Sequence, residues 1–195
     1  MMRRKPNLFL LAGITLILVS CALVVVNQFR IRSGVSHCAE LASRIEAALP
    51  PRSAGYVGIY SDPNMPVLEL DGTDWCGILE VPAYGLTLPI HGSWDKSAVT
   101  SYPCRFWGSV YDGSMILGGS DQNGQFAFCS QTNPGDYISI TDMLGNEFRY
   151  QVARVDRSDS ADFEKLSAGE YPLTLFTRST FGLEYIIVRC NDRFR

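Results

Sequence analysis

The sequence predicts an all-β sandwich or barrel that follows two N-terminal helices. Residues 8–26 form an uninterrupted apolar stretch, and residues 33–49 repeat apolar side chains at helical spacing. From residue 56 onward, short apolar and aromatic runs alternate with Gly, Pro and Asp turn signals. Helical patterns are sparse in this last part, so strands must supply its core.

The apolar stretch at residues 8–26 has the length of a membrane span. At about 1.5 Å per residue it nearly crosses a hydrocarbon core about 30 Å thick. The basic residues 3–5 favour a cytoplasmic N-terminus and an exported remainder, although Arg30 and Arg32 on the far side weaken this preference. We therefore expect a single-pass protein of the cell membrane with its domain on the extracellular face.

Two other interpretations of this stretch remain open. Residues 18–21 resemble a bacterial lipobox, in which Cys21 would carry the lipid, but the chain stays apolar where a lipoprotein normally turns polar. A cleaved signal peptide usually has a shorter apolar core and an A-x-A-like site, which we do not find. Each interpretation places the domain outside the membrane.

Residues 33–49 predict an amphipathic helix that ends at Pro50 and Pro51. Its expected role is a stalk that docks on the domain, and a partner-binding helix is the alternative. The predicted organisation is a cytoplasmic N-terminus (1–7), a transmembrane anchor (8–27), a juxtamembrane helix and linker (28–55) and an extracellular domain (56–195).

The predicted strands of the domain are short and separated by turn residues. They are residues 56–60, 67–71, 75–81, 86–90, 115–117, 125–129, 137–141, 147–155, 173–177 and 185–190. Residues 142–146, which include Gly145, predict a hairpin loop between two of them. Residues 93–101 and 161–166 are the short helix candidates.

Charge and composition argue against several kinds of ligand. The net charge is −3 and there is no basic stripe, so nucleic acid is not an expected partner. The chain has two histidines and no C-x-x-C pair, so we expect no metal site and no cofactor. Most cysteines should be small buried side chains, and one disulfide can form in an exported domain. The candidates for it are Cys38, Cys76, Cys104, Cys129 and Cys190.

Three stretches carry a resemblance to a known family. Residues 77–90 read GILEVPAYGLTLPI, residues 115–119 read MILGG, and residues 173–178 and 185–189 read LTLFTR and YIIVR. Phe126, a Gly-Asp pair and the predicted hairpin lie between the second and third stretches. In order and spacing these motifs resemble those of sortases, nearest to the class B type of Gram-positive bacteria.

The resemblance implies a sortase-like closed eight-stranded β-barrel with short helices, facing the cell wall. In that family a Cys thiolate attacks the Thr carbonyl of a sorting signal, a His moves protons and an Arg stabilises the oxyanion. The enzyme cleaves the signal and joins the protein to an amine of peptidoglycan or of another subunit.

The three catalytic positions of the family hold other residues in this chain. The motif T-C falls on Thr177-Arg178, A-G-H ends on Gly119, and the final-strand Arg falls on Tyr185. Gly119 has no side chain to carry a proton, and Arg178 stays protonated and cannot be a nucleophile. Tyr185 can still donate one hydrogen bond. We therefore predict no intact catalytic residue.

A relocated catalytic site would need another nucleophile and another base. Cys129 is the best spare thiol, although its position matches a core residue of the family. Ser120 and Ser179 neighbour the substituted positions, but neither has a histidine near it in sequence. His91 follows a predicted strand and fits a surface position equally well.

A charged Arg178 in the remnant groove calls for a carboxylate or for solvent. We expect Asp121, two residues after the position of the family His, or another groove acid to pair with it. Ser120 and Ser179 should lie nearby as further groove partners.

The leading hypothesis is therefore a pseudo-enzyme that binds a peptide without cutting it. Its expected partners are a sorting-signal peptide, a pilin-like subunit or another sortase. One alternative is an active transpeptidase or peptidase with a relocated site. The other is a structural surface domain whose groove is filled by bulky residues such as Phe181 and Tyr185.

Overall fold

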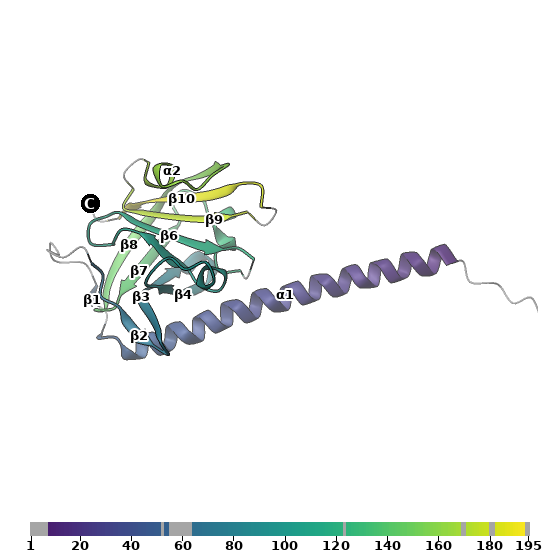
Figure 1. The fold of residues 1–195 in the computed structure, drawn as a ribbon, viewed down its shortest axis with the longest axis horizontal. Helices are drawn as coiled ribbons and strands as arrows, with labels where there is room; N and C mark the ends of the chain where they lie inside the picture. Colours follow the sequence, from purple (N-terminus) through teal and green to yellow (C-terminus); the bar gives the residue numbers. More distant parts are fainter. Residues whose placement is uncertain are drawn as a thin grey trace, which may run out of the picture.

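The computed structural model describes residues 8–51, 53–54, 64–122, 124–168, 171–179 and 182–193. A long helix precedes a β-rich domain (Figure 1). The helical elements are α1 (Leu8–Ala48), α2 (Phe163–Ser167) and the 3₁₀ turns η1 (Pro82–Tyr84), η2 (Ala98–Thr100) and η3 (Ala127–Ser130). The strands are β1 (Ser53–Ala54), β2 (Leu68–Leu70), β3 (Thr73–Val81), β4 (Leu86–His91), β5 (Cys104–Trp107), β6 (Met115–Ser120), β7 (Tyr137–Asp142), β8 (Asn146–Ser158), β9 (Leu173–Arg178) and β10 (Tyr185–Asp192).

The strands β3 to β10 close into a barrel. Hydrogen bonds join them in the order β7-β8-β10-β9-β6-β5-β4-β3, and β3 pairs with β7 to complete the ring. Within this ring β6 and β9 run parallel, whereas β9 and β10 are antiparallel. The short β1 and β2 lie beside β8 and β3. The predicted closed eight-stranded barrel with few short helices is confirmed, and closure removes the exposed sheet edges that invite aggregation.

Alternate side chains of the strands point into the barrel and form its core. The main cluster includes Leu79 from β3, Leu88 from β4, Leu117 from β6 and Leu175 from β9, all fully buried. Each such leucine contributes about 2 kcal/mol relative to an exposed position. This core holds the ends of β6, β9 and β10 in fixed relative positions.

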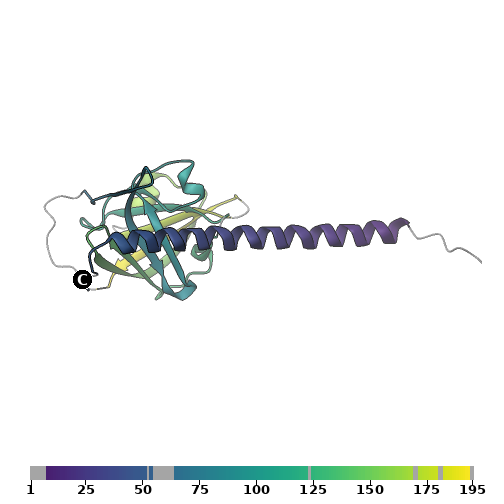
Figure 2. The same cartoon turned by 90° about the horizontal axis from the view of Figure 1, so that it is seen from below.

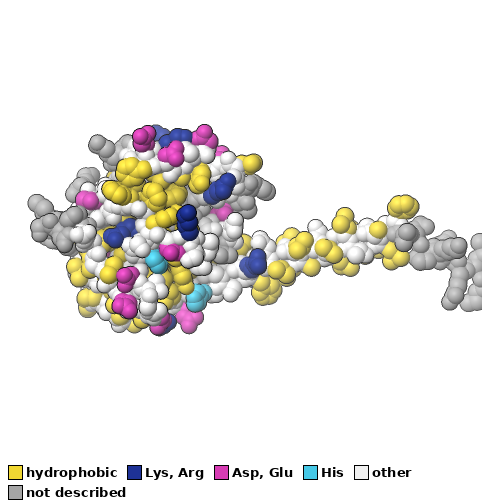
Figure 3. All heavy atoms as spheres, viewed as in Figure 1, with side chains coloured by type: hydrophobic (Ala, Val, Ile, Leu, Met, Phe, Trp, Pro, Cys, Tyr) yellow, Lys and Arg dark blue, Asp and Glu magenta, His cyan; other side chains and the backbone are white. Residues whose placement is uncertain are grey.

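One continuous helix, α1, takes the place of the two predicted helices. Residues 27–33 contain neither Pro nor Gly, so nothing interrupts the helical hydrogen bonds there. The first half of α1 projects from the barrel with exposed apolar side chains (Figures 1 and 3), and it is long and apolar enough to span a membrane. The second half docks on the barrel, as predicted, and buries Cys38, Leu41, Ala42 and Ile45 (Figure 2).

Some predicted elements differ from the structure. The strand predicted at residues 125–129 is wrong, because η3 buries Phe128 and Cys129 within a turn. A short apolar run fits a strand and a buried turn equally well. The helix predicted at residues 93–101 is limited to η2, and β5 was not among the predicted strands. The strand predicted at residues 56–60 lies outside the described residues.

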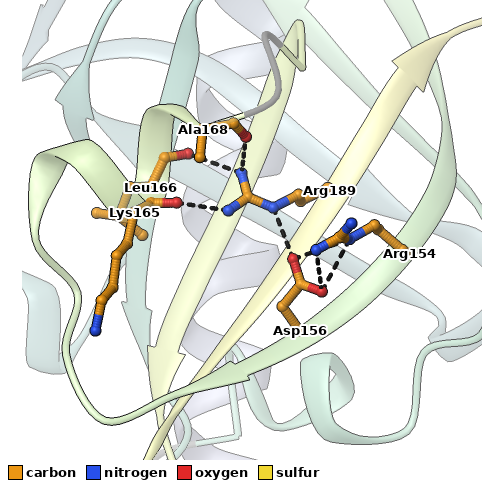
Figure 4. A network of polar contacts seen from close by, with 6 residues as sticks. All are labelled: Arg154, Asp156, Lys165, Leu166, Ala168 and Arg189. Carbon is orange, nitrogen blue, oxygen red and sulfur yellow. Dashed lines mark hydrogen bonds and ion pairs between the residues drawn. The ribbon is translucent and has the colours of Figure 1, made fainter.

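A buried arginine joins α2 to the barrel (Figure 4). Arg189 of β10 is only 5% exposed, and its Nε donates to Oδ2 of Asp156 on β8 at 2.8 Å. The same guanidinium donates to carbonyl groups at the end of α2, those of Lys165, Leu166 and Ala168. Arg154 binds the Asp156 carboxylate from the solvent side. The network thereby satisfies carbonyl groups that a helix end leaves without partners.

Candidate functional site

The three positions that the sequence motifs align with the catalytic residues of sortases meet at one end of the barrel. The parallel pairing of β6 with β9 sets Gly119 opposite Thr177 and Ser120 opposite Arg178. The antiparallel pairing of β9 with β10 sets Arg178 opposite Tyr185. Segments that are far apart in sequence therefore converge here, as the sequence motifs implied.

These positions line a common groove of about 430 Å³. Its polar lining includes Ser120 at the end of β6, Asp121 directly after it, and Ser179 directly after β9. The predicted groove residues therefore all lie in one place. Thr177 also lines the groove, and its buried Oγ1 has no hydrogen-bond partner within the described part of the chain.

The floor of the groove is aromatic. Trp94, in the loop between β4 and η2, stacks on Phe176 of β9 with ring centroids 5.7 Å apart. Phe106 of β5 meets Trp94 edge-on at 5.2 Å and Phe176 edge-on at 5.4 Å. Trp94 remains 38% exposed, so part of its ring is open to a ligand. Such a surface provides large apolar contact area at little cost in side-chain entropy.

The space beside Gly119 is already occupied. A Cβ built on Gly119 would lie 2.4 Å from Cδ2 of Phe126, which is fully buried. The backbone N–H of Phe126 donates to the carbonyl of Ser120 at 3.0 Å, which ties the main chain of Phe126 to the end of β6. A histidine at this position would therefore require Phe126 to move.

Arg178 contacts the β9–β10 turn instead of the expected carboxylate. Its Nε donates to the carbonyl oxygen of Gly182 at 3.1 Å, and its guanidinium lies 5.9 Å from the centroid of the Tyr185 ring. Among the described residues it forms no ion pair with Asp121 or with another acid, so the predicted pairing is wrong. Because Arg178 is exposed, solvent already stabilises its charge and no buried carboxylate is needed.

The groove does not bring a serine and a histidine together. Oγ of Ser120 accepts a hydrogen bond from the backbone N–H of Gln122. The chain has two histidines, and neither lines the groove. His37 contacts the hydroxyl of Tyr102, and His91 bonds to the carbonyl of Ser93 through Nδ1. A serine hydrolase arrangement is therefore not assembled in this groove.

The cysteines of the domain are all free and buried, so no disulfide is formed. Burial raises the pKa of Cys38 and Cys104 to about 11, and that of Cys76 to about 12. The pKa values of Cys129 and Cys190 are raised by burial as well. A nucleophilic thiolate needs the opposite shift, toward or below neutral pH. These cysteines therefore fit the predicted role of small apolar core residues.

Thiol labelling tests this description of the cysteines. In a folded Cys21→Ser chain, iodoacetamide should modify the remaining cysteines at least about a hundredfold more slowly than free cysteine, because raised pKa values remove the thiolate. Unfolding in denaturant should restore rapid labelling, which serves as the control. Mass spectrometry assigns the modified residues. One rapidly modified cysteine in the folded chain would identify a relocated nucleophile and contradict this expectation.

Comparisons with known proteins agree with the fold. No family model matches the sequence, and no curated protein matches it. The solved structure of sortase C1 from Streptococcus agalactiae matches with a TM-score of 0.55 and 19% identity, over 65% of this chain and 72% of that chain. The chain has the sortase fold. At this level of identity the similarity establishes the sortase fold alone.

Two further sortase structures also match the chain. Sortase C-3 from Streptococcus pneumoniae matches with a TM-score of 0.54 and 16% identity, over 85% of this chain and 84% of that chain. Sortase A from Listeria monocytogenes matches with a TM-score of 0.52 and 18% identity, over 61% and 87%. The resemblance inferred from short motifs is thus confirmed for the sortase fold.

Sequence reasoning missed the aromatic floor of the groove. Trp94 lies in a stretch predicted to be helical, and nothing in the sequence links it to Phe106 or Phe176. Phe126 was recognised only as a motif residue, without its packing against position 119. In the described ranges, no three His, Cys, Asp or Glu side chains cluster closely enough to hold a metal ion.

Proposed function

We propose that this chain is an inactive sortase homologue that binds a peptide in its groove without cutting it. The observation that carries the proposal is an open groove whose described lining includes neither a cysteine nor a histidine. Sortase turnover needs a thiolate and a proton carrier. Gly119 and Arg178 can supply neither, and the buried thiols elsewhere in the barrel do not replace them.

The groove retains features that suit an extended peptide. Trp94 and Phe106 offer an apolar surface to a ligand. Arg178 favours a ligand that carries an acidic group, although Asp121 on the same groove restricts where that group can bind. The remaining volume of about 430 Å³ favours binding over a purely structural role. Tyr185 lines this space without filling it, and Phe181 lies outside the described residues.

The setting proposed for this groove is the outer face of a Gram-positive cell membrane. Residues 8–27 of α1 would cross the membrane once, with residues 1–7 in the cytoplasm, residues 28–55 next to the membrane and residues 56–195 outside it. Within the sortases the motifs resemble class B, whereas the similar structures named above belong to classes A and C. A sorting-signal peptide, a pilin-like subunit or another sortase is the proposed partner.

Peptide binding and turnover can be measured together on the full chain in detergent. Fluorogenic sorting-signal peptides should bind saturably by fluorescence anisotropy, and their cleavage should not exceed the rate in buffer. Trp94→Ala should weaken binding about tenfold, because a central aromatic anchor is lost from the groove. Trp107→Ala is the matched control, since Trp107 is 57% exposed and does not line the groove.

The outcomes separate the three hypotheses. Cleavage by the wild-type chain would contradict the proposal and indicate a relocated catalytic site. Absence of saturable binding across acidic and neutral peptides would favour a structural domain. Equal losses in Trp94→Ala and Trp107→Ala would place the ligand outside the groove.

A further inference from the structure

The anchor and the barrel are joined without a flexible linker. Because α1 is continuous, the apolar stretch that ends at residue 26 leads directly into the docked half of the helix. Among the described residues, Ile31 is the first side chain of α1 that is not exposed, and its Cγ2 would lie 2.7 Å from a Cβ built on Gly124. Asn27 and Ile31 are four residues apart, which is about 6 Å along a helix. The loop that carries Gly124 therefore lies close to the end of the membrane span.

The order of contacts along α1 defines which end of the barrel faces the membrane. Ile45 packs with Trp75 near the end of the helix, and Sγ of Cys38 contacts the carbonyl of Ser101 at 3.4 Å. A Cβ on Gly145, in the β7–β8 turn, would lie 2.8 Å from the carbonyl oxygen of Pro50. The β7–β8 turn thus lies at the distal end, about 30 Å along the helix from residue 28.

The groove lies at the membrane end of the barrel. Gly124 follows β6 closely, and its N–H donates to the carbonyl of Asp121, which lines the groove. Since β6 and β9 are parallel, both strands finish at this end, and the β9–β10 turn lies beside it. In Figures 1 and 2 this hairpin points in the direction in which α1 leaves the barrel.

Exposed apolar and basic side chains are found at this end. Leu183 in the β9–β10 turn is 85% exposed and Phe29 of α1 is 70% exposed, while Arg30 and Arg32 are also exposed. The carbonyl group of Gly182, next to Leu183, accepts a hydrogen bond from Nε of Arg178 at 3.1 Å. Apolar side chains beside arginines are the composition that favours binding at an anionic membrane interface.

We propose that the groove end of the barrel rests on the surface of the lipid bilayer. In this orientation Leu183 and Phe29 enter the headgroup region, and Arg30 and Arg32 pair with anionic headgroups. Arg178 bonds to Gly182, the residue before Leu183. The groove then opens at the membrane surface, where it receives only segments that lie close to that surface. This inference rests on the membrane anchor of the proposed function.

Depth-dependent quenching in reconstituted vesicles tests the orientation. The full chain is reconstituted into vesicles of phosphatidylcholine and phosphatidylglycerol, with Cys21→Ser and either Leu183→Cys or Leu144→Cys labelled with a bimane fluorophore. Leu144 is the matched control, because it is a 50% exposed leucine in the distal β7–β8 turn. Lipids with a nitroxide near the headgroup should remove most of the emission at position 183 and leave that at position 144 unchanged.

Each outcome supports or overturns the orientation. Equal quenching at the two positions, or none at position 183 in vesicle-bound protein, would show that the groove end does not rest on the bilayer. Failure of the chain to float with vesicles would contradict the anchor itself and so the proposed membrane location. Both replaced side chains are exposed, so we expect both labelled variants to fold. Circular dichroism is the control that checks this.

Discussion

Replacing Arg189 with leucine is expected to lower the free energy of unfolding by about 3 kcal/mol. The substitution places an apolar side chain in the buried position but leaves Asp156 without its inner partner. It also leaves the carbonyl groups at the end of α2 without their shared donor. Thermal and denaturant unfolding of the full chain in detergent, followed by circular dichroism, measures the change.

Arg154→Leu is the matched control for that change. Arg154 binds the same Asp156 carboxylate, but its side chain is 59% exposed and bonds to no carbonyl of α2. Because exposed ion pairs contribute little, its unfolding should stay close to that of the wild type. Equal destabilisation by the two substitutions would mean that the ion pair, and not the buried carbonyl contacts, supports α2.

Introducing histidine at Gly119 is expected to destabilise the barrel by about 2 kcal/mol and to restore no turnover. The new Cβ would overlap the ring of Phe126, so Phe126 or the end of β6 must shift. Adding Arg178→Cys and Tyr185→Arg to the same chain should still yield no cleavage of sorting-signal peptides, because the histidine cannot reach its place. The unfolding free energy and peptide cleavage are the two measurements.

A double substitution shows whether Phe126 is the obstacle. Phe126→Ala alone should cost about 4 kcal/mol through the cavity that it leaves. If the clash is real, Gly119→His and Phe126→Ala together should cost clearly less than the sum of the single changes. Ser120→His, one residue along β6, controls for adding a histidine at the groove. A strictly additive double variant would contradict the packing account.

Much of the barrel could be predicted from local sequence. Alternation of apolar and polar side chains, with turn residues between runs, indicated β3, β4 and β6 to β10 within a few residues of their bounds. Residues 125–129 show the limit of this reasoning, because an apolar run is buried equally well by η3. The closure of β3 on β7 and the parallel pairing of β6 with β9 depend on contacts between distant segments, which local patterns do not encode.

The sequence alone determined that positions 119 and 178, which the motif resemblance aligns with the catalytic His and Cys of sortases, hold Gly and Arg. The identity of a side chain sets its chemistry, so these two positions supply neither an imidazole nor a thiolate. The sequence also determined a membrane-length apolar helix and the positions that would share a groove. Only the tertiary structure decided that Phe126 occupies the space beside Gly119, and that Arg178 bonds to Gly182 instead of Asp121. These contacts depend on distances between groups on different elements, and such distances exist only once the barrel has closed.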